Sequence, residues 1–475
     1  MCTTLLVVLV FGCESRDAVL DTAGESAEAA STTAGASTPT VDATSSADTD
    51  LPTIDTGGAT SPSTTEETTA GPSATFRAHF LDPESDGPAF TTVVDIDDDG
   101  SLDVIVSAFG TSLSVPPGTV TLYRRGATLD DWTPEVIAGR SEGIRFPNQT
   151  HAADLDGDGD LDVIVPYGFL VCEAVPWVGR CGGLAWFEQT PGGWIRHTLV
   201  DGEELFFHGV QLADLDGDGL TDMFTVRERI NAFGPDTAEA VWYRGSLGPD
   251  LFDPRPQVAG PGLGSFPTLH DVDGDGDLDA VSAEYAMEGG SFAWLEQVTP
   301  PGLEDAGDWE RHILDDTSGP AIQLALIPDL YGDGVLRAVG SNHTNTEQSS
   351  PDPWESAIIA FTPTADPRDP WAKEQLSEGI RSAPGSIAAP QAAPGIFGWG
   401  DLDGDGDLDI AVAGDGDPRV MWMEQQSPGR FAMRVLHPDL PQAGGMSIVD
   451  LDGNGSNEII VTGYEDSVVF VLERE

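Results

Sequence analysis

The chain has 475 residues, of which 39% are hydrophobic, so it is long enough to bury a substantial core and is not expected to be disordered throughout. Its 81 acidic and 21 basic side chains give a formal charge of −60, which argues against a nucleic-acid partner and opposes compaction through self-repulsion. A solvated acidic surface is the simplest interpretation. Many of the acids nevertheless recur at fixed spacings, which favours bound cations.

Residues 1–13 contain an apolar run from Leu5 to Phe11 that is too short to span a bilayer and lies where a signal peptide would. The run ends in Val10-Phe11-Gly12-Cys13, which resembles a bacterial lipoprotein box. We therefore expect an exported chain tethered to the membrane through lipidated Cys13, at the bacterial cell envelope or cell surface. A secreted protein with an ordinary signal peptide is the alternative, because no Lys or Arg precedes the run.

Residues 14–73 are dominated by Ser, Thr, Ala, Gly, Pro and Asp, without a periodic apolar pattern. This composition predicts a disordered linker. A flexible tether of this length has a typical reach of ~40 Å, enough to hold a domain clear of a membrane. No later apolar stretch approaches the ~18 residues of a membrane span.

From residue 74 to residue 475 the chain repeats itself. Seven acidic clusters recur at intervals of 49 to 72 residues, which indicates one supersecondary unit per repeat. The clusters begin at Asp95, Asp154, Asp214, Asp271, Asp329, Asp401 and Asp450.

Each repeat contains four runs of strand length. An apolar run such as HGVQLA precedes the cluster, and a β-branched run such as NEIIVTG follows it. A third run such as SFAWLEQ and a fourth such as WERHILD complete the unit. Four short strands per repeat without helical periodicity predict an all-β fold, a seven-bladed β-propeller of four-stranded blades.

The two ends of the repeat region predict how the ring closes. The last repeat stops at Arg474-Glu475, after its third strand, and residues 75–82, TFRAHFLD, match the fourth-strand pattern. We expect this N-terminal strand to complete the final blade. Closure of this kind removes two exposed sheet edges.

The acidic clusters have the donor pattern of a calcium loop. The second cluster, DLDGDGDLD, carries carboxylates at loop positions 1, 3, 5 and 9, and Gly159 at position 6 permits a sharp reversal. Calcium takes six to eight oxygens, which these side chains and the carbonyl of position 7 would supply together with water. The loop is not an EF-hand, because position 12 carries no Glu. A metal-free Asp-Gly turn is the alternative for any one loop; recurrence favours metal.

Five loops carry the complete pattern, and the seventh keeps oxygen donors with substitutions. In the fifth loop, Asp329, Tyr331 and Asp333 are followed by Arg337 where the closing carboxylate belongs, so we predict that this loop binds no metal. About five or six calcium ions are therefore expected. The predicted ligands, with position 7 contributing its carbonyl, are Asp95, Asp97, Asp99, Ser101 and Asp103; Asp154, Asp156, Asp158, Asp160 and Asp162; Asp214, Asp216, Asp218, Leu220 and Asp222; Asp271, Asp273, Asp275, Asp277 and Asp279; Asp401, Asp403, Asp405, Asp407 and Asp409; and Asp450, Asp452, Asn454, Ser456 and Glu458.

Two cysteines fall within the repeats, at Cys172 and Cys181 in the segment CEAVPWVGRC. In an exported chain a local disulfide is the default expectation. A metal pair is the weaker alternative, because no further Cys or nearby His completes a zinc set.

The DxDxDGxxD loops, the strand after them and the Trp-x-Glu third strands resemble FG-GAP/VCBS-type propeller repeats, which also occur in the integrin α-subunit head. The resemblance covers residues 75–475. It implies structural calcium in loops between the first and second strands of each blade. It does not fix a ligand.

We interpret the chain as a binding or adhesion module for a protein or a glycan, and we expect a monomer. The longest loops join second to third strands, on the face away from calcium, and loops on rigid scaffolds commonly carry function. Trp177 and Trp354 in these loops are candidates for stacking on sugar rings, with local packing as the alternative.

The alternative function is a carbohydrate-active enzyme, such as a polysaccharide lyase. His151, His208 and His270 fall in or near first strands that would line the central channel, with Tyr285 or Arg145 beside them. Channel lining is the simpler interpretation. Four further histidines, His79, His197, His312 and His437, recur near fourth strands and are expected to be structural. We assign no catalytic residue.

Overall fold

The computed structural model describes residues 75–111, 116–168, 179–229, 236–248, 250–287, 290–302, 306–344, 355–383 and 392–475. The predicted leader with Cys13, the linker, Cys172, Trp177 and Trp354 lie outside these residues and stay predictions. Among the described residues, none forms a helix with the length and apolar character that crossing a membrane requires.

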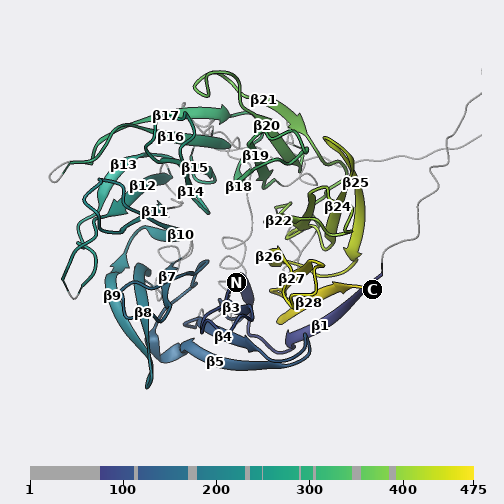
Figure 1. Cartoon of the computed structure of the whole chain (residues 1–475), viewed down its shortest axis with the longest axis horizontal. Helices are drawn as coiled ribbons and strands as arrows, with labels where there is room; N and C mark the ends of the chain where they lie inside the picture. The colour runs from purple at the N-terminus through teal and green to yellow at the C-terminus, as the bar shows by residue number, and fades with distance from the viewer. Residues whose placement is uncertain are drawn as a thin grey trace, which may run out of the picture. The chain divides into compact units, whose positions relative to one another are not determined.

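The described residues form seven four-stranded antiparallel sheets arranged in a ring, which confirms the seven-bladed β-propeller (Figure 1). Blade 1 contains β2 (Pro88–Val94), β3 (Asp103–Ala108), β4 (Thr119–Arg125) and β5 (Trp132–Ala138). Blade 2 contains β6 (His151–Ala153), β7 (Asp162–Tyr167), β8 (Gly182–Thr190) and β9 (Gly193–Glu203). Blade 3 contains β10 (Phe206–Ala213), β11 (Asp222–Arg229), β12 (Thr237–Tyr243) and β13 (Gln257–Pro261).

The remaining blades repeat the same order. Blade 4 contains β14 (Thr268–His270), β15 (Asp279–Ala283), β16 (Phe292–Thr299) and β17 (Asp308–Asp315). Blade 5 contains β18 (Ala321–Ile327), β19 (Arg337–Asn342), β20 (Ile358–Thr362) and β21 (Ala372–Gln375). Blade 6 contains β22 (Phe397–Gly400), β23 (Asp409–Ala413), β24 (Val420–Ser427) and β25 (Arg430–His437). A short 3₁₀ helix, η2 (Arg140–Glu142), precedes blade 2.

Blade 7 joins the two ends of the repeat region. It contains β26 (Ala443–Val449), β27 (Glu458–Gly463) and β28 (Val468–Arg474), and its outer strand is β1 (Phe76–Asp82). β1 runs antiparallel to β28, with Phe76 opposite Arg474 and Phe80 opposite Phe470. The predicted closure by the N-terminal strand is therefore confirmed.

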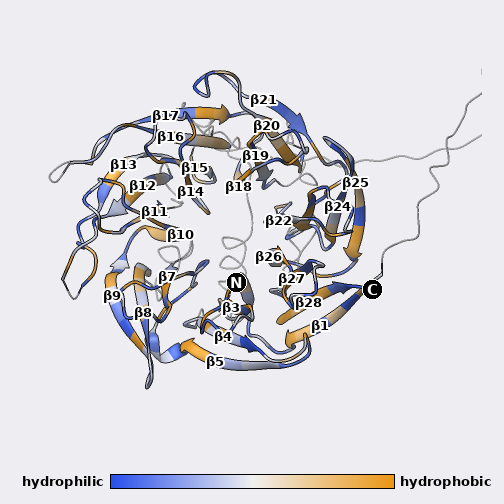
Figure 2. Cartoon of the chain, in the orientation of Figure 1, coloured by the Kyte–Doolittle hydropathy of each residue, from blue (hydrophilic) through white to orange (hydrophobic). Residues whose placement is uncertain are grey.

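The hydrophobic core lies between neighbouring blades. Blades 1 and 2 share a cluster in which Ile105 and Leu122 pack with Val163 and Phe187. Equivalent clusters join blades 3 and 4, and blades 7 and 1. Because each sheet is covered on both faces by its neighbours, the second strands are buried along their whole length in every blade except blade 3, where Arg227 and Arg229 of β11 are half-buried. Figure 2 shows hydrophobic colour in every blade.

Antiparallel connectivity gives the ring two distinct faces. The acidic loops join first to second strands, and the hairpins between third and fourth strands share this acidic-loop face. The loops between second and third strands, together with the connections from each blade to the next, lie on the opposite face.

Removing the closing strand tests the ring. A chain that begins at Ser85 lacks β1 and leaves the edge of β28 unpaired, so we expect a lower melting temperature and self-association relative to a chain that begins at Thr75. Thermal unfolding and size-exclusion chromatography of the two chains measure this. Equal melting temperatures would show that β1 does not contribute to closure.

Candidate calcium loops

All seven acidic loops occupy the same place in their blades, and we number them 1 to 7 with the blades. Each connects the first strand to the second, and its ninth residue is the first residue of the second strand. This closing residue is buried in every blade, with at most 6% of its surface exposed. The predicted placement of the loops is thus what the structure shows.

Backbone N–H groups turn the carboxylates toward the inside of each loop. In loop 2, Asp156 Oδ1 accepts from Asp158 N at 3.0 Å, and Asp158 Oδ1 accepts from Asp160 N at 2.9 Å. The corresponding bonds recur in loops 3, 4, 6 and 7. Gly159 at position 6 has φ +100°, a conformation that side chains disfavour, which explains the glycine there.

The carboxylates of each complete loop converge. Three carboxylate oxygens lie within 4.8 Å of one another in all five complete loops. Positions 1, 3 and 5 supply them in loops 1, 2 and 3, and positions 1, 3 and 9 supply them in loops 4 and 6. Such a donor set, all hard oxygens at close range, fits calcium.

The closing carboxylate also fixes the loop to the sheet. Asp162 Oδ2 accepts from Leu155 N at 3.1 Å, and Asp162 Oδ1 accepts from Gln189 N of β8 at 3.0 Å. Asp222, Asp279 and Asp409 each accept the same pair of bonds. The closing acid therefore has a structural role that the sequence pattern did not reveal.

Burial raises the pKa of the closing acids. It raises the pKa of Asp162 to about 6, those of Asp279 and Asp409 to about 7, and that of Glu458 to about 7. Neighbouring carboxylates of the same loops add to the increase. A bound cation would offset both effects.

Buried carboxylate oxygens without a hydrogen-bond partner support the fit to a cation. Among the described residues these include Asp103 Oδ2 in loop 1, and Asp450 Oδ1 and Glu458 Oε1 in loop 7. Glu458 is fully buried, and an unpaired buried carboxylate oxygen is costly. Loop 7 thus keeps a donor set suited to metal despite its substitutions.

Loop 5 contains its own cation. Arg337 donates to both oxygens of Asp333, at 2.7 and 2.6 Å, and its guanidinium lies 4.1 Å from the centre of the Tyr331 ring. These hydrogen bonds hold the pKa of Asp333 at about 2. The guanidinium pairs with an acid that a metal would need, and the absence of metal from this loop stays a prediction.

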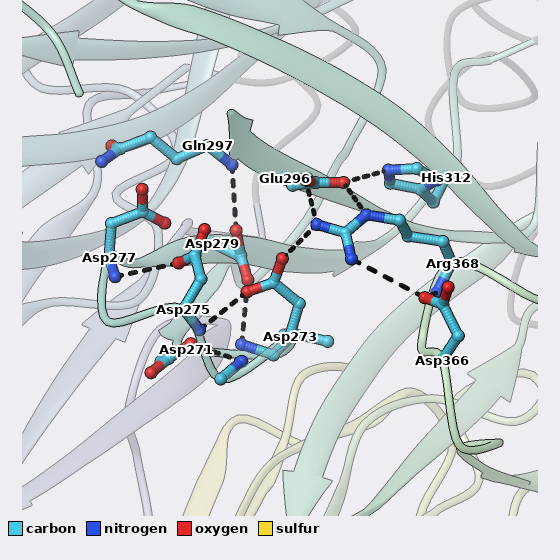
Figure 3. Close-up of polar contacts among 12 residues, drawn as sticks. Asp271, Asp273, Asp275, Asp277, Asp279, Glu296, Gln297, His312, Asp366 and Arg368 are labelled. Atoms are coloured by element: carbon cyan, nitrogen blue, oxygen red, sulfur yellow. Dashed lines mark hydrogen bonds and ion pairs between the residues drawn. The ribbon is translucent and has the colours of Figure 1, made fainter. Parts of the chain in front are cut away.

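Three other arginines pair with carboxylates of acidic loops, and the sequence analysis did not single them out. Arg474 also contacts loop 6, but through the backbone carbonyl of Asp403. Arg124 Nη1 lies 2.5 Å from Asp97 Oδ2, and Arg244 Nη1 lies 2.7 Å from Asp216 Oδ2. Arg368, in the hairpin between β20 and β21 of blade 5, pairs with Asp273 and Glu296 of blade 4 (Figure 3). Each of these three arginines pairs with the carboxylate at loop position 3.

Three of the four histidines near fourth strands pair with carboxylates of neighbouring strands. His197 stacks on Trp186 with ring centres 4.0 Å apart and pairs with Glu188 at 2.7 Å. His312 repeats this arrangement, and His79 pairs with Glu473. In blade 6 the equivalent place, opposite Trp422, belongs to Arg434 and not to His437.

The other candidate residues are distributed around the ring. His208 is buried and pairs with Glu228 at 2.6 Å. His151 is half-buried, with its pKa lowered by burial, whereas His270 is exposed. Cys181 is disulfide-bonded, but Cys172 lies outside the described residues, so that pairing stays a prediction.

A polar pair on the opposite face was missed by the sequence analysis. His343 Nδ1 lies 2.9 Å from the carbonyl oxygen of Pro394, which makes Nδ1 the donor and leaves Nε2 as an acceptor 3.7 Å from Asp415 Oδ2. The Tyr285 ring centre lies 6.0 Å from the His343 ring. Burial lowers the pKa of His343 to about 4 and raises that of Asp415 to about 7.

A scan against protein families matches residues 95–165 and 401–461 to the FG-GAP-like repeat. These segments run from an acidic loop through the following strands. The chain carries FG-GAP-like repeats. Together with the seven-bladed ring, these two matches confirm the resemblance seen in the sequence. A comparison with curated proteins finds no match.

Solved structures that match the chain include two fungal enzymes. The α-L-arabinofuranosidase of Fusarium graminearum is 10% identical, with a TM-score of 0.45 over 84% of this chain and 97% of that chain. The α-L-arabinanase of Penicillium chrysogenum is 10% identical, with a TM-score of 0.40 over 85% of this chain and 99% of that chain. A puromycin hydrolase is 13% identical, with a TM-score of 0.45 over 80% and 50%. At these scores no activity is inferred from them.

Loop 5 allows a gain-of-function test. In the double variant Tyr331→Asp and Arg337→Asp, the loop regains carboxylates at positions 3 and 9, and we expect one additional bound calcium ion per chain. Elemental analysis after dialysis counts the ions. The control is Arg337→Ala, which removes the guanidinium without adding a carboxylate and should add no ion. An unchanged count in the double variant would contradict the loop assignment.

The raised pKa values of the closing acids predict how the stability of the calcium-free chain depends on pH. An acid whose pKa is higher in the folded than in the unfolded state binds more protons when folded, so its stabilising contribution is lost as pH rises from about 4 through about 7. With chelator, the melting temperature should therefore fall by several degrees between pH 5 and pH 8. Saturating calcium should abolish this fall.

Asp409→Asn should weaken the pH dependence in chelator, because it removes one of the buried acids. Asp98→Asn, at an exposed position of loop 1, should not. A melting temperature that rises with pH in chelator would contradict the prediction.

Proposed function

We propose that the protein is a binding module in which about five or six calcium ions stabilise the ring and the opposite face recognises a protein or a polysaccharide. Calcium binding is proposed because carboxylates converge in the loops between first and second strands, and because some of their buried oxygens have no hydrogen-bond partner. When bound, calcium would neutralise these carboxylates and hold together the first and second strands of each blade whose loop it occupies.

The contrast between the two faces supports a recognition role for the opposite one. The acidic loops are nearly uniform from blade to blade. The second strand of each blade reaches the opposite face six residues after the closing position of its loop. The residue type at this position varies around the ring. These residues are Phe109, Gly168, Glu228, Tyr285, His343, Asp415 and Tyr464.

Several of these variable residues touch one another around the ring. The Phe109 and Tyr464 rings of blades 1 and 7 lie 6.3 Å apart, and His343 of blade 5 lies between Tyr285 and Asp415 of the neighbouring blades. Phe90 of blade 1 also meets Phe266, which precedes blade 4, with ring centres 5.5 Å apart. Of these aromatic residues, Phe109 is buried and Phe90, Phe266, Tyr285 and Tyr464 are half-buried. Half-buried aromatic rings beside hydrogen-bonding groups are typical of ligand sites.

Glycan and protein arrays with calcium and with chelator test the recognition role. We expect binding that depends on calcium, because chelation loosens the ring, and that falls at least about tenfold in His343→Ala and Asp415→Asn. Asp98→Asn on the acidic-loop face is the matched control and should bind normally. Full binding by the two opposite-face variants would place recognition elsewhere.

Catalysis is the second candidate function, favoured by one observation: the Nε2 lone pair of His343 faces a carboxylate, with Tyr285 beside it. Such a group can act as a general base. Incubation with neutral and anionic polysaccharides separates the two functions. Turnover that His343→Ala abolishes would favour the enzyme, and binding without turnover would favour the module.

We also propose that the protein is exported and held at the bacterial cell envelope through Cys13, with residues 14–73 as a tether. The apolar run before Cys13 and the composition of the linker support this. Detection of a lipid-modified Cys13 by mass spectrometry after expression in a bacterial host would test it. A mature chain cleaved elsewhere and found in the medium would contradict the anchor.

A further inference from the structure

We propose that the five complete loops fall into two classes of calcium affinity. The class depends on whether an arginine contacts Oδ2 of the aspartate at loop position 3. This inference rests on the proposed calcium function and concerns which loops fill first. Loops 2 and 6 form the open class. Loops 1, 3 and 4 form the arginine-paired class.

The two oxygens of the position 3 carboxylate have different partners. In loops 2, 3, 4 and 6, Oδ1 accepts the N–H of position 5 at 3.0 to 3.2 Å. This leaves Oδ2 as the oxygen available to an ion. The position 3 residues of loops 2 and 6 are Asp156 and Asp403. Within the described residues, neither carboxylate forms an ion pair.

In the paired class, Oδ2 is in contact with a guanidinium. Arg124 contacts Asp97 Oδ2 and Arg368 contacts Asp273 Oδ2. Arg244 contacts Asp216 Oδ2 at 2.7 Å, as an ion pair without the geometry of a hydrogen bond. The side chains of Asp216 and Asp273 are each only 2% exposed, so water screens these two pairs little. Calcium must displace the arginine or do without this oxygen.

In blades 1, 2, 3 and 6 the third strand decides the class. Arg124 and Arg244 follow the third-strand residues Tyr123 and Tyr243, at the place where blades 2, 4 and 6 carry Glu188, Glu296 and Glu424. In blades 2 and 6 these glutamates pair with His197 and Arg434 of the fourth strand. Neither partner forms an ion pair with a loop carboxylate among the described residues.

Blade 4 joins the paired class by a different route. Its Glu296 pairs with His312 and also with Arg368 of the next blade, and Figure 3 shows the guanidinium between Glu296 and Asp273. When calcium takes the Asp273 oxygen, Arg368 can keep Glu296. Calcium at loop 4 therefore changes a contact between blades 4 and 5.

Calorimetric titration of the chelator-stripped protein with CaCl₂ tests the two classes. We expect loops 2 and 6 to fill first and loops 1, 3 and 4 to fill at concentrations about tenfold higher, a difference of about 1.4 kcal/mol. Asp156→Asn should remove one ion from the tight class. Asp216→Asn should remove one ion from the weak class.

Replacing the arginines provides the decisive comparison. Arg244→Gln and Arg368→Gln should each move one ion from the weak class to the tight class. Arg244→Lys keeps a positive charge and should leave that ion in the weak class. Arg140→Gln, whose native partner Asp86 lies on the opposite face, should change neither class.

The outcomes separate this inference from the proposed function. One affinity class, unchanged by Arg244→Gln and Arg368→Gln, would overturn the two-class inference while leaving calcium binding intact. No calcium binding by the protein or by any variant would overturn both. If a Gln variant unfolds before titration, the Asp156→Asn and Asp216→Asn pair still assigns the loops to classes.

Discussion

Carboxylates that point into one small loop repel each other. In this protein such a loop connects the first strand to the second strand in each of the seven blades. The backbone N–H groups of each loop hold the acids in place, and the buried closing acid fixes the loop to the second and third strands. Hydrogen bonds alone leave some buried oxygens unpaired, as Glu458 Oε1 and Asp103 Oδ2 show. We therefore propose that a positive charge at these loops stabilises the ring.

The protein has two sources of that charge. In loop 5 the chain supplies it, because Arg337 pairs with Asp333 at the place of the closing acid. In the complete loops we assign it to calcium, with arginines at loops 1, 3 and 4 as partial substitutes. This division leaves the acidic-loop face to stabilise the fold. In the proposed function, the opposite face, where the residues differ between blades, recognises the ligand.

The sequence predicted the fold well because the repeat makes each element visible several times. The seven loops, the four strands per blade and the closure by Phe76–Asp82 all follow from aligned spacing. The arginine contacts were less accessible. For Arg124 and Arg244 the sequence held a signal of their contacts, since each is an arginine where other blades carry glutamate. Arg368 belongs to another blade and lies 95 positions from Asp273, so an alignment of the repeats cannot reveal this contact. The His343 and Asp415 pair likewise depends on contacts between blades.

The most direct measurement of the central claim is the number of calcium ions bound by the purified protein, combined with thermal unfolding before and after chelation. The account predicts five or six ions per chain and a large fall in melting temperature when they are removed, because the loop carboxylates then repel one another. A protein that binds no calcium and unfolds at the same temperature with and without chelator would contradict it.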